Sequence, residues 1–171
     1  SGYLPEAVVN FVALLGWNPG NEHEEVMSME DLIQHFRIEK CSKAGAKFDY
    51  EKGKWFNHHY IQQACDERLA ELLRPALESE GIAFDLARVA KTIALVKERA
   101  QVLPELLDQI RFFFVAPTEY DEKTVKKRWK EDSAQQMKEL IELLSTQPEE
   151  LPSEATEEVV KAWIEGQGYG L

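Results

Sequence analysis

The stretch DLARVAKTIALVKERAQVLPELLDQI, residues 85–110, decides the fold class because its apolar residues recur at the spacing of a helix. Asp85 stands before the first apolar residue, where an aspartate can cap a helix. One apolar stripe follows, at Leu86, Val89, Ile93, Val96 and Ala100. Pro104 marks the first turn of the next helix, where a missing N–H costs nothing. The stretch therefore predicts two consecutive helices, the first over residues 85–101.

The same periodicity appears on both sides of this stretch. Residues 5–16 predict a helix whose apolar face is formed by Val8, Phe11, Val12 and Leu15. Further helices are predicted near residues 28–36, 49–55, 66–80, 121–130, 137–144 and 153–163. No segment alternates convincingly between apolar and polar residues. The predicted fold class is therefore all-α, a helical bundle or cage of roughly eight antiparallel helices joined by short loops.

Five residues predict where helices begin, end or bend. Gly16 is expected in the left-handed conformation that ends a helix, and Gly81 is expected to end another. Ser28 is expected to cap the helix that follows it, in a capping box with the aspartate three residues on. Ser153 is expected to cap the last helix, and Pro75 to kink or break the helix that contains it.

The composition is that of a globular chain. It has 171 residues, of which 44% are hydrophobic and 30% charged, and no window approaches 18 consecutive apolar residues. The first residues lack the pattern of a secretory signal. Two cysteines do not make a disulfide framework, so a reduced cytoplasmic setting is expected.

The net charge of −11 argues against a nucleic-acid partner, because phosphate binding relies on Lys and Arg. Two segments carry a net positive charge. Residues 88–130 carry ten basic and six acidic residues, and residues 40–54 carry five and two. Such segments are either an anion-binding face or solvated helix faces, and composition alone favours the second.

No catalytic signature is present, neither a P-loop nor a GxGxxG, GxSxG or HExxH motif. The possible soft-metal ligands are Cys41, His58, His59 and Cys65. Their spacing matches no zinc arrangement, and two surface histidines and two buried thiols are expected instead. Adjacent acids occur at Glu24 and Glu25 and at Glu149 and Glu150, and solvated carboxylates are expected there. We therefore expect no catalytic residue, no metal site and no cofactor in this chain.

Recognition remains as a possible function. Lys97 and Arg99 stand two apart near the end of the predicted helix 85–101, so they flank the helix. The planar guanidinium of an arginine can pair with a base edge or a phosphate. The alternative is an exposed arginine in a salt bridge at a helix end, and the residues alone favour that alternative.

Three motifs follow one another in the first third of the chain: GYLPEAVVNFVALLGW at 2–17, SMEDLIQHF at 28–36 and KCSKAGAKFDYEKGKWFNHHYI at 40–61. The last contains Ser-Lys-x-Gly-Ala-x-Phe-Asp and then Lys-x-x-Trp-x-Asn-x-x-Tyr-Ile. In this order the motifs resemble the segment that follows the second signature loop of bacterial glutamate–tRNA ligases. The resemblance covers residues 2–62 well and the remainder more loosely, through VKERAQVLPEL and FFF.

The resemblance implies the carboxyl-terminal part of a class I synthetase, without the domain that binds ATP and the amino acid. It implies a stem-contact helical region at residues 1–63 and a first anticodon-binding subdomain at 64–118. A second, incomplete anticodon-binding subdomain is implied at 119–171, because the family continues past GYGL with another helical segment. Weak tRNA binding by this chain alone is expected.

The resemblance also implies site residues. Arg99 aligns with the family arginine that reads the third anticodon base and would favour C, with Lys97 as a second anticodon-binding residue. Contacts to the tRNA backbone are implied for Lys43, Lys47, Lys52 and Lys54. ATP and Mg²⁺ are implied for the full-length ligase only. The implied partner is glutamate-specific tRNA, bound by a cytoplasmic monomer, with no membrane and no DNA partner.

A helical protein-interaction module with no role in RNA binding is the alternative. The acidic pI of about 4.9 and the apolar stripes favour it. Salt separates the two interpretations, because RNA binding weakens steeply as salt rises, whereas a helix in a groove depends on apolar contact.

Overall fold

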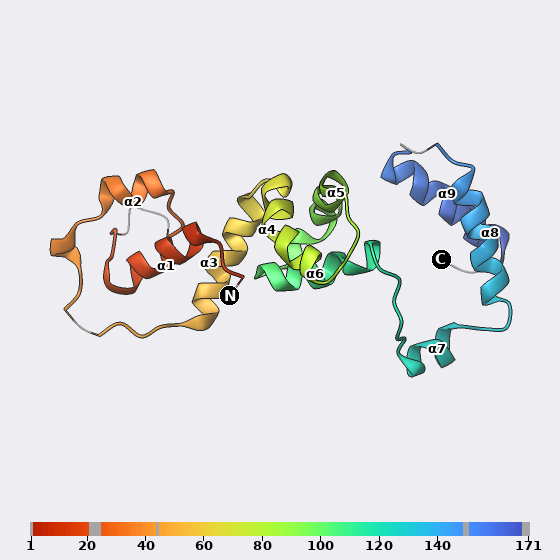
Figure 1. The fold of residues 1–171 in the computed structure, drawn as a ribbon, viewed down its shortest axis with the longest axis horizontal. Coiled ribbons are helices and arrows are strands. Elements are labelled where there is room, and N and C mark those ends of the chain that lie inside the picture. Colours follow the sequence, from red (N-terminus) through yellow and green to blue (C-terminus); the bar gives the residue numbers. More distant parts are fainter. Residues whose placement is uncertain (1, 21–24, 44, 149–150, 169–171) are drawn as a thin grey trace. The chain divides into compact units, whose positions relative to one another are not determined.

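The computed structural model describes residues 2–20, 25–43, 45–148 and 151–168, and these residues form an all-α structure (Figure 1). The chain divides into two compact units, Ser1–Pro117 and Thr118–Leu171. The first unit contains α1 (Pro5–Gly16), α2 (Met29–His35), α3 (Tyr50–Gln63), α4 (Asp66–Ser79), α5 (Leu86–Val96) and α6 (Leu103–Ile110). It also contains the 3₁₀ turns η1 (Ile38–Lys40), η2 (Lys97–Arg99) and η3 (Arg111–Phe113). The second unit contains α7 (Glu122–Arg128), α8 (Ser133–Ser145) and α9 (Ser153–Gly166). No strand occurs in the described residues, apart from one isolated bridge between Trp17 and Cys41. The predicted fold class is confirmed.

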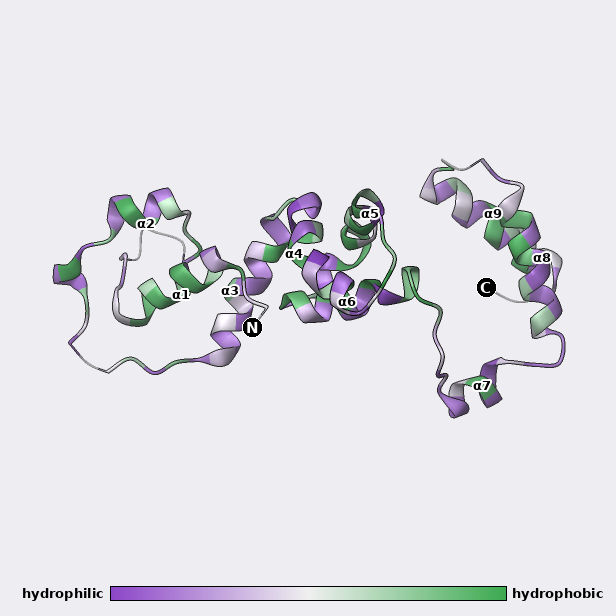
Figure 2. Ribbon diagram, in the orientation of Figure 1, coloured by the Kyte–Doolittle hydropathy of each residue, from purple (hydrophilic) through white to green (hydrophobic). Residues whose placement is uncertain are grey.

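The main core of the first unit lies where α4, α5 and α6 pack together. Its fully buried side chains include Leu69 and Leu77 of α4, Val89 and Ile93 of α5, and Ile110 of α6. The helices around this core carry both hydrophobic and hydrophilic residues, as amphipathic helices do (Figure 2). Burial of one stripe from each helix is therefore what holds these three helices together.

The helix α1 packs on α3 by a different face from the one its sequence predicts. Ala7 and Phe11 are buried, but Val8 and Val12 are 42% and 51% exposed. The ring of Phe11 lies 5.8 Å from that of Phe56 in α3. The apolar residues of α1 cover more than one face, so periodicity alone could not determine which face meets α3.

A buried asparagine ties α1 to the connection before α2. Asn10 Nδ2 donates to the carbonyl oxygen of Glu25 at 3.1 Å, and Met27 N donates to Asn10 Oδ1 at 2.9 Å. The Tyr60 hydroxyl of α3 lies 2.6 Å from the Met27 carbonyl oxygen and 2.9 Å from Asn10 Oδ1. Burial, with a smaller contribution from the charge of Glu6, raises the pKa of Tyr60.

Two of the five predicted helix boundaries are confirmed. Ser28 caps α2 in a capping box, with Asp31 N donating to Ser28 Oγ at 3.0 Å. Gly81 follows α4 with a φ of +67°, the left-handed conformation that favours glycine.

The predictions for Gly16 and Ser153 are wrong, and the break that is one of the two outcomes predicted at Pro75 does not occur. Gly16 is not left-handed, because the chain leaves α1 in an extended conformation at Trp17. Pro75 lies inside α4 without ending it, because buried Leu73 and Leu77 hold the helix against the core on both sides. Ser153 is the first residue of α9, and Pro152 occupies the N-cap position.

The second unit has little interior of its own. None of its described residues is buried, and in α9 Val159, Val160 and Trp163 are half-buried. Ile141 of α8 is 63% exposed. Fewer contacts that are shielded from water therefore stabilise this unit than stabilise the first.

An ion pair joins α1 to α4 and makes the first unit sensitive to acid. Arg68 donates to both carboxylate oxygens of Glu6, at 2.5 and 3.1 Å. Partial burial opposes ionisation of Glu6, but the hydrogen bonds and charge of Arg68 outweigh it and lower the pKa of Glu6. A lowered folded-state pKa contributes stability that is present above the unfolded-state pKa and is lost as pH falls.

We therefore expect Glu6→Gln to flatten the pH dependence of the unfolding free energy below about pH 5. Urea denaturation monitored by tryptophan fluorescence at pH 7 and pH 4 checks this. The destabilisation by Glu6→Gln should be larger at pH 7 than at pH 4. An equal destabilisation at both pH values would mean that the pair contributes nothing through ionisation.

Candidate nucleic-acid interface

Arg99 ends a short turn on the surface of the first unit. The predicted helix 85–101 is shorter than expected: α5 ends at Val96, and the chain tightens into η2 over Lys97–Arg99. The Arg99 side chain is exposed, and it makes no ion pair or hydrogen bond within the described part of the chain. A free guanidinium with five donors is therefore presented to solvent.

Three side chains of α3 hold this turn by its backbone. Gln62 Nε2 donates to the carbonyl oxygen of Lys97 at 2.6 Å. His58 Nδ1 lies 2.8 Å from the carbonyl oxygen of Ala100, so the tautomer protonated at Nδ1 donates there. Asn57 Nδ2 donates to the carbonyl oxygen of Gln101 at 2.5 Å. The backbone on both sides of Arg99 is thus anchored to one helix.

Asn57 also anchors the first residues of the chain. Leu4 N donates to Asn57 Oδ1 at 2.7 Å, and Leu103 N donates to the carbonyl oxygen of Gly2 at 2.9 Å. Gly2 has a φ of +77°, and a Cβ placed on it would lie 2.3 Å from Pro104 Cδ. Only glycine fits this close approach, so the amino-terminal segment packs directly against the start of α6.

Lys97 has a different environment from Arg99. Its ammonium lies 2.8 Å from Asp66 Oδ1 and donates to the carbonyl oxygen of Ala64 at 3.3 Å. Both charged side chains are mostly buried, at 21% and 25% exposure. Lys97 therefore fastens η2 to the start of α4, and an anticodon contact by its ammonium would have to compete with this pair.

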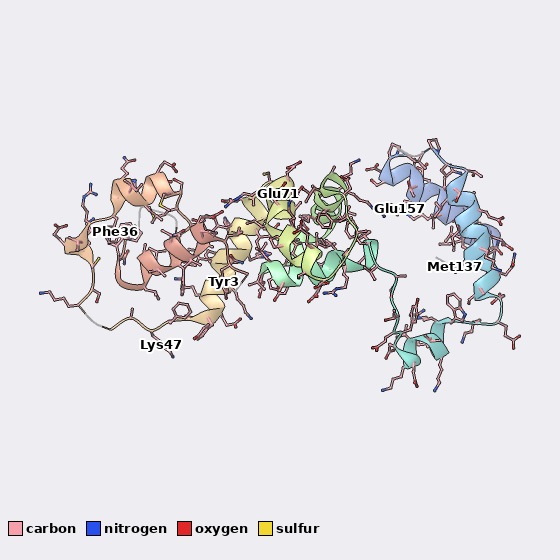
Figure 3. All side chains as sticks on the ribbon, viewed as in Figure 1. Tyr3, Phe36, Lys47, Glu71, Met137 and Glu157 are labelled. Carbon is pink, nitrogen blue, oxygen red and sulfur yellow. The ribbon has the colours of Figure 1, made fainter. Side chains whose placement is uncertain are left out.

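The four lysines expected at the RNA backbone lie before and within the first turns of α3. Lys43 and Lys47 are exposed and have no ion pair in the described residues, and Figure 3 shows Lys47 on the connection that leads into α3. Lys52 lies 2.7 Å from Glu25 Oε1, and Lys54 lies 3.7 Å from Glu51 Oε1. Because exposed ion pairs contribute little, these two cations are still available to a polyanion.

The sequence interpretation missed a second group of cations as a site. They lie on α7 of the second unit and are Lys123, Lys126, Lys127 and Arg128. All four are exposed, and the ion pair there joins Lys126 to Glu122 at 3.9 Å. The consecutive Lys-Lys-Arg at the end of a short helix is the signal that could have identified them.

The cysteine and histidine set does not form a metal site. Cys41 is half-buried and Cys65 is exposed, so the prediction of two buried thiols is wrong. His58 holds Ala100, and the ring of His59 lies 5.9 Å from that of Trp55. In the described ranges no three His, Cys, Asp or Glu side chains come together as metal ligands.

The structure describes one of the four adjacent acids. Glu25 is exposed and paired with Lys52. Glu24, Glu149 and Glu150 lie outside the residues that the structure describes.

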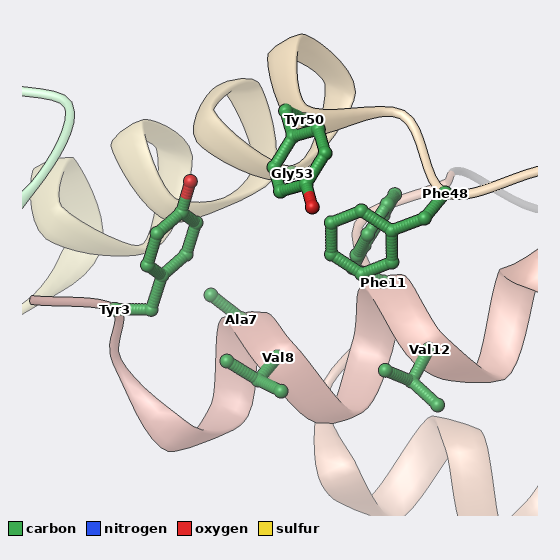
Figure 4. A pocket seen from close by; sticks show the side chains of 8 residues that line it. All are labelled: Tyr3, Ala7, Val8, Phe11, Val12, Phe48, Tyr50 and Gly53. Carbon is green, nitrogen blue, oxygen red and sulfur yellow. The ribbon is translucent and has the colours of Figure 1, made fainter. Parts of the chain in front are cut away.

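An apolar pocket of about 240 Å³ lies between α1 and the start of α3 (Figure 4). It is lined by Tyr3, Ala7, Val8, Phe11, Val12, Phe48, Tyr50 and Gly53. None of these side chains is a carboxylate, imidazole, thiol or ammonium. The pocket therefore offers no cation for nucleotide phosphates, and the groups in its lining that could take part in acid–base chemistry are the phenol hydroxyls of Tyr3 and Tyr50.

Comparisons with known proteins relate this chain to tRNA synthetases. Residues 68–171 match the anticodon binding domain family, and residues 1–55 match the catalytic domain of class I tRNA synthetases (E and Q). Over all 171 residues the chain is 61% identical to a glutamate–tRNA ligase of Porphyromonas gingivalis and 58% identical to one of Parabacteroides distasonis. It covers 34% of each, so it spans about a third of the length of these relatives.

The fold is similar to that of a solved relative. A glutamate tRNA ligase from Elizabethkingia meningosepticum, in complex with its amino acid, matches with a TM-score of 0.83 and 37% identity. The match covers 99% of this chain and 33% of that one. No helix in the described residues is long and apolar enough to cross a membrane.

Proposed function

This chain belongs to the anticodon-binding domain family, and from that membership we infer that it binds the anticodon arm of a tRNA as part of a glutamate–tRNA ligase. The observation that carries the proposal is the exposed, unpaired Arg99 on a backbone turn that three side chains of α3 hold in place. Bases of a single-stranded loop can be splayed out and recognised by such a side chain.

Arg99 would recognise the pairing edge of cytosine by hydrogen-bond complementarity. The pairing edge of cytosine carries two adjacent acceptors, N3 and O2, and a guanidinium offers two parallel donors. The pairing edge of guanine carries two adjacent donors, N1–H and the 2-amino group, which would face the guanidinium with like polarity. Arg99 would therefore favour C over G at the third anticodon position.

The lysines would supply affinity without base preference. Phosphate contacts position a nucleic acid and carry no sequence information. We assign these contacts to Lys43, Lys47, Lys52 and Lys54, and we add the exposed cations of α7. Lys97 would contribute indirectly, because its ion pair with Asp66 holds the turn η2 in place.

The chemistry of the whole ligase would lie outside this chain. A full-length protein that joins glutamate to its tRNA would use ATP and Mg²⁺, but the residues described here do not fit either group. The apolar pocket has no cation for phosphates, and no cluster of metal ligands occurs in the described part.

Residues 1–63 would contact the tRNA stem, and residues 64–118 and 119–171 would form two anticodon-binding subdomains. The ligase would act in the cytoplasm as a monomer on glutamate-specific tRNA, without a membrane or DNA partner.

A salt titration of tRNA binding tests the RNA role. We expect the affinity of the chain for a glutamate tRNA transcript to fall steeply between 50 and 200 mM salt, because counterions are released when phosphates are neutralised. Lys43→Ala and Lys47→Ala should each flatten the slope of log K against log salt by about one, and weaken binding to all tRNAs alike.

Lys161→Ala is the matched control, because Lys161 is the one basic residue of α9, a helix with four glutamates that would repel a polyanion. It should leave the slope unchanged. Binding that does not depend on salt, or slopes equal in all three variants, would contradict the assignment of these lysines and favour a protein-interaction module.

A further inference from the structure

We propose that His58 and Gln62 are positioning residues for base recognition, which act by fixing the turn that carries Arg99. This inference rests on the proposed function. The two side chains lie on one face of α3, four residues apart, and each donates to a backbone carbonyl of the segment that contains Arg99.

The turn η2 is not rigid by its own hydrogen bonding. It is three residues long, and its internal bond runs from Ala100 N to the carbonyl oxygen of Lys97 at 3.2 Å. Such 3₁₀ turns have poor hydrogen-bond geometry and are stable only in short pieces. The bonds from Gln62 and His58, at 2.6 and 2.8 Å, are shorter than this internal bond. The support therefore comes from outside the turn, from these two side chains of α3 and from the pair of Lys97 with Asp66.

Both supports are partly shielded from water. Gln62 and His58 are half-buried, whereas Arg99 itself is exposed. A hydrogen bond that is shielded from water is electrostatically stronger than one at the surface. The structure thus combines a fixed backbone with a guanidinium that is free to meet a ligand.

Base discrimination depends on this placement more than phosphate binding does. A planar fork must meet two acceptors in one plane, and functional groups need to be held within roughly 0.5 Å to do so. A lysine ammonium acts as a point charge and tolerates small shifts. Loosening the turn should therefore lower the preference for C over G while leaving affinity for a G-containing loop nearly constant.

The test measures the dissociation constants of the 171-residue chain for two anticodon stem–loop RNAs that differ only in the third anticodon base, C or G. Gln62→Leu and His58→Ala should each lower the ratio of the two constants by about 3- to 10-fold, the equivalent of one hydrogen bond. His58→Asn should restore the ratio, because the asparagine amide nitrogen can reach the place of Nδ1.

Neighbouring residues of the same types are the controls. Gln63 is exposed, and His59 lies by Trp55 instead of the turn. Gln63→Leu and His59→Ala should keep the ratio of the wild type. If Gln62→Leu unfolds the chain, Gln62→Glu replaces it, since a carboxylate of the same length cannot donate to the Lys97 carbonyl.

A double-mutant cycle separates positioning from a general structural effect. Arg99→Gln should abolish the preference, and adding Gln62→Leu to it should change the ratio no further. A preference abolished by Arg99→Gln but untouched by Gln62→Leu and His58→Ala would overturn the positioning role and leave the proposed function standing. A preference untouched by Arg99→Gln would overturn base recognition by Arg99 and this inference with it.

Discussion

Asn57→Leu is expected to destabilise the first unit by about 3–5 kcal/mol, a large part of the 5–15 kcal/mol typical of a domain. Asn57 is fully buried, and its amide bonds the backbone of Leu4 and Gln101. Leucine has a similar volume but leaves the buried N–H of Leu4 and the partly buried C=O of Gln101 without partners. Each such loss costs about 1–3 kcal/mol.

Urea denaturation followed by tryptophan fluorescence measures this effect. Asn18→Ala is the control, because Asn18 is exposed and bonds only the nearby Gly20 N at 2.9 Å. The control should lie within about 1 kcal/mol of the wild type. If Asn57→Leu also stayed within that range, the amide would not be the anchor described here.

Arg99→Gln is expected to remove most of the discrimination between C and G at the third anticodon position. A good bidentate pair contributes about 1–3 kcal/mol of discrimination, so the loss should be about 10- to 100-fold. Glutamine is neutral and does not present the two parallel donors of the guanidinium. Folding should be unaffected, because Arg99 is exposed and unpaired in the described residues.

Glutamylation assays with a full-length ligase that contains this sequence measure the effect. The kcat/KM values are compared as a ratio for two tRNA transcripts that differ in the third anticodon base, C or G. Arg74→Gln serves as the control: it removes an arginine paired with Glu71 at 2.7 Å on α4, and the ratio should not change. Equal discrimination by Arg99→Gln and the wild type would refute the assigned role.

The features that the sequence predicts well are local. Asp85 accepts a hydrogen bond from Arg88 N at 3.0 Å and Ser28 caps α2, both as predicted, and the stripe of α5 is buried at Val89 and Ile93. Capping and amphipathic periodicity act within a few residues, so they can be identified from sequence alone.

The features that the sequence does not predict depend on distant partners. Asn57 bonds Leu4 and Gln101, which are 53 and 44 residues away. Lys97 pairs with Asp66 of another helix, which periodicity could not indicate. The helix α3 is continuous from Tyr50 to Gln63, whereas the sequence predicts a helix near 49–55, because Phe56 and Asn57 are buried against α1 and the turn at 97–101.

The candidate site is predicted from the sequence only in part. The resemblance to a family identifies Arg99, but its exposure and its support from α3 come from tertiary contacts. Charge counting identifies Lys43 and Lys47 as basic, but not that they are unpaired while Lys52 and Lys54 are paired.

The most direct measurement is the NMR signal of the Arg99 side-chain Nε–H, assigned through loss of that signal in Arg99→Gln and followed as anticodon stem–loop RNA is added. A loop with C at the third anticodon position should shift this signal at concentrations where a loop with G does not. The backbone amides of Lys43 and Lys47 should respond equally to both loops. An Nε–H signal that does not shift, or that shifts equally with the C loop and the G loop, would contradict recognition of the base by Arg99.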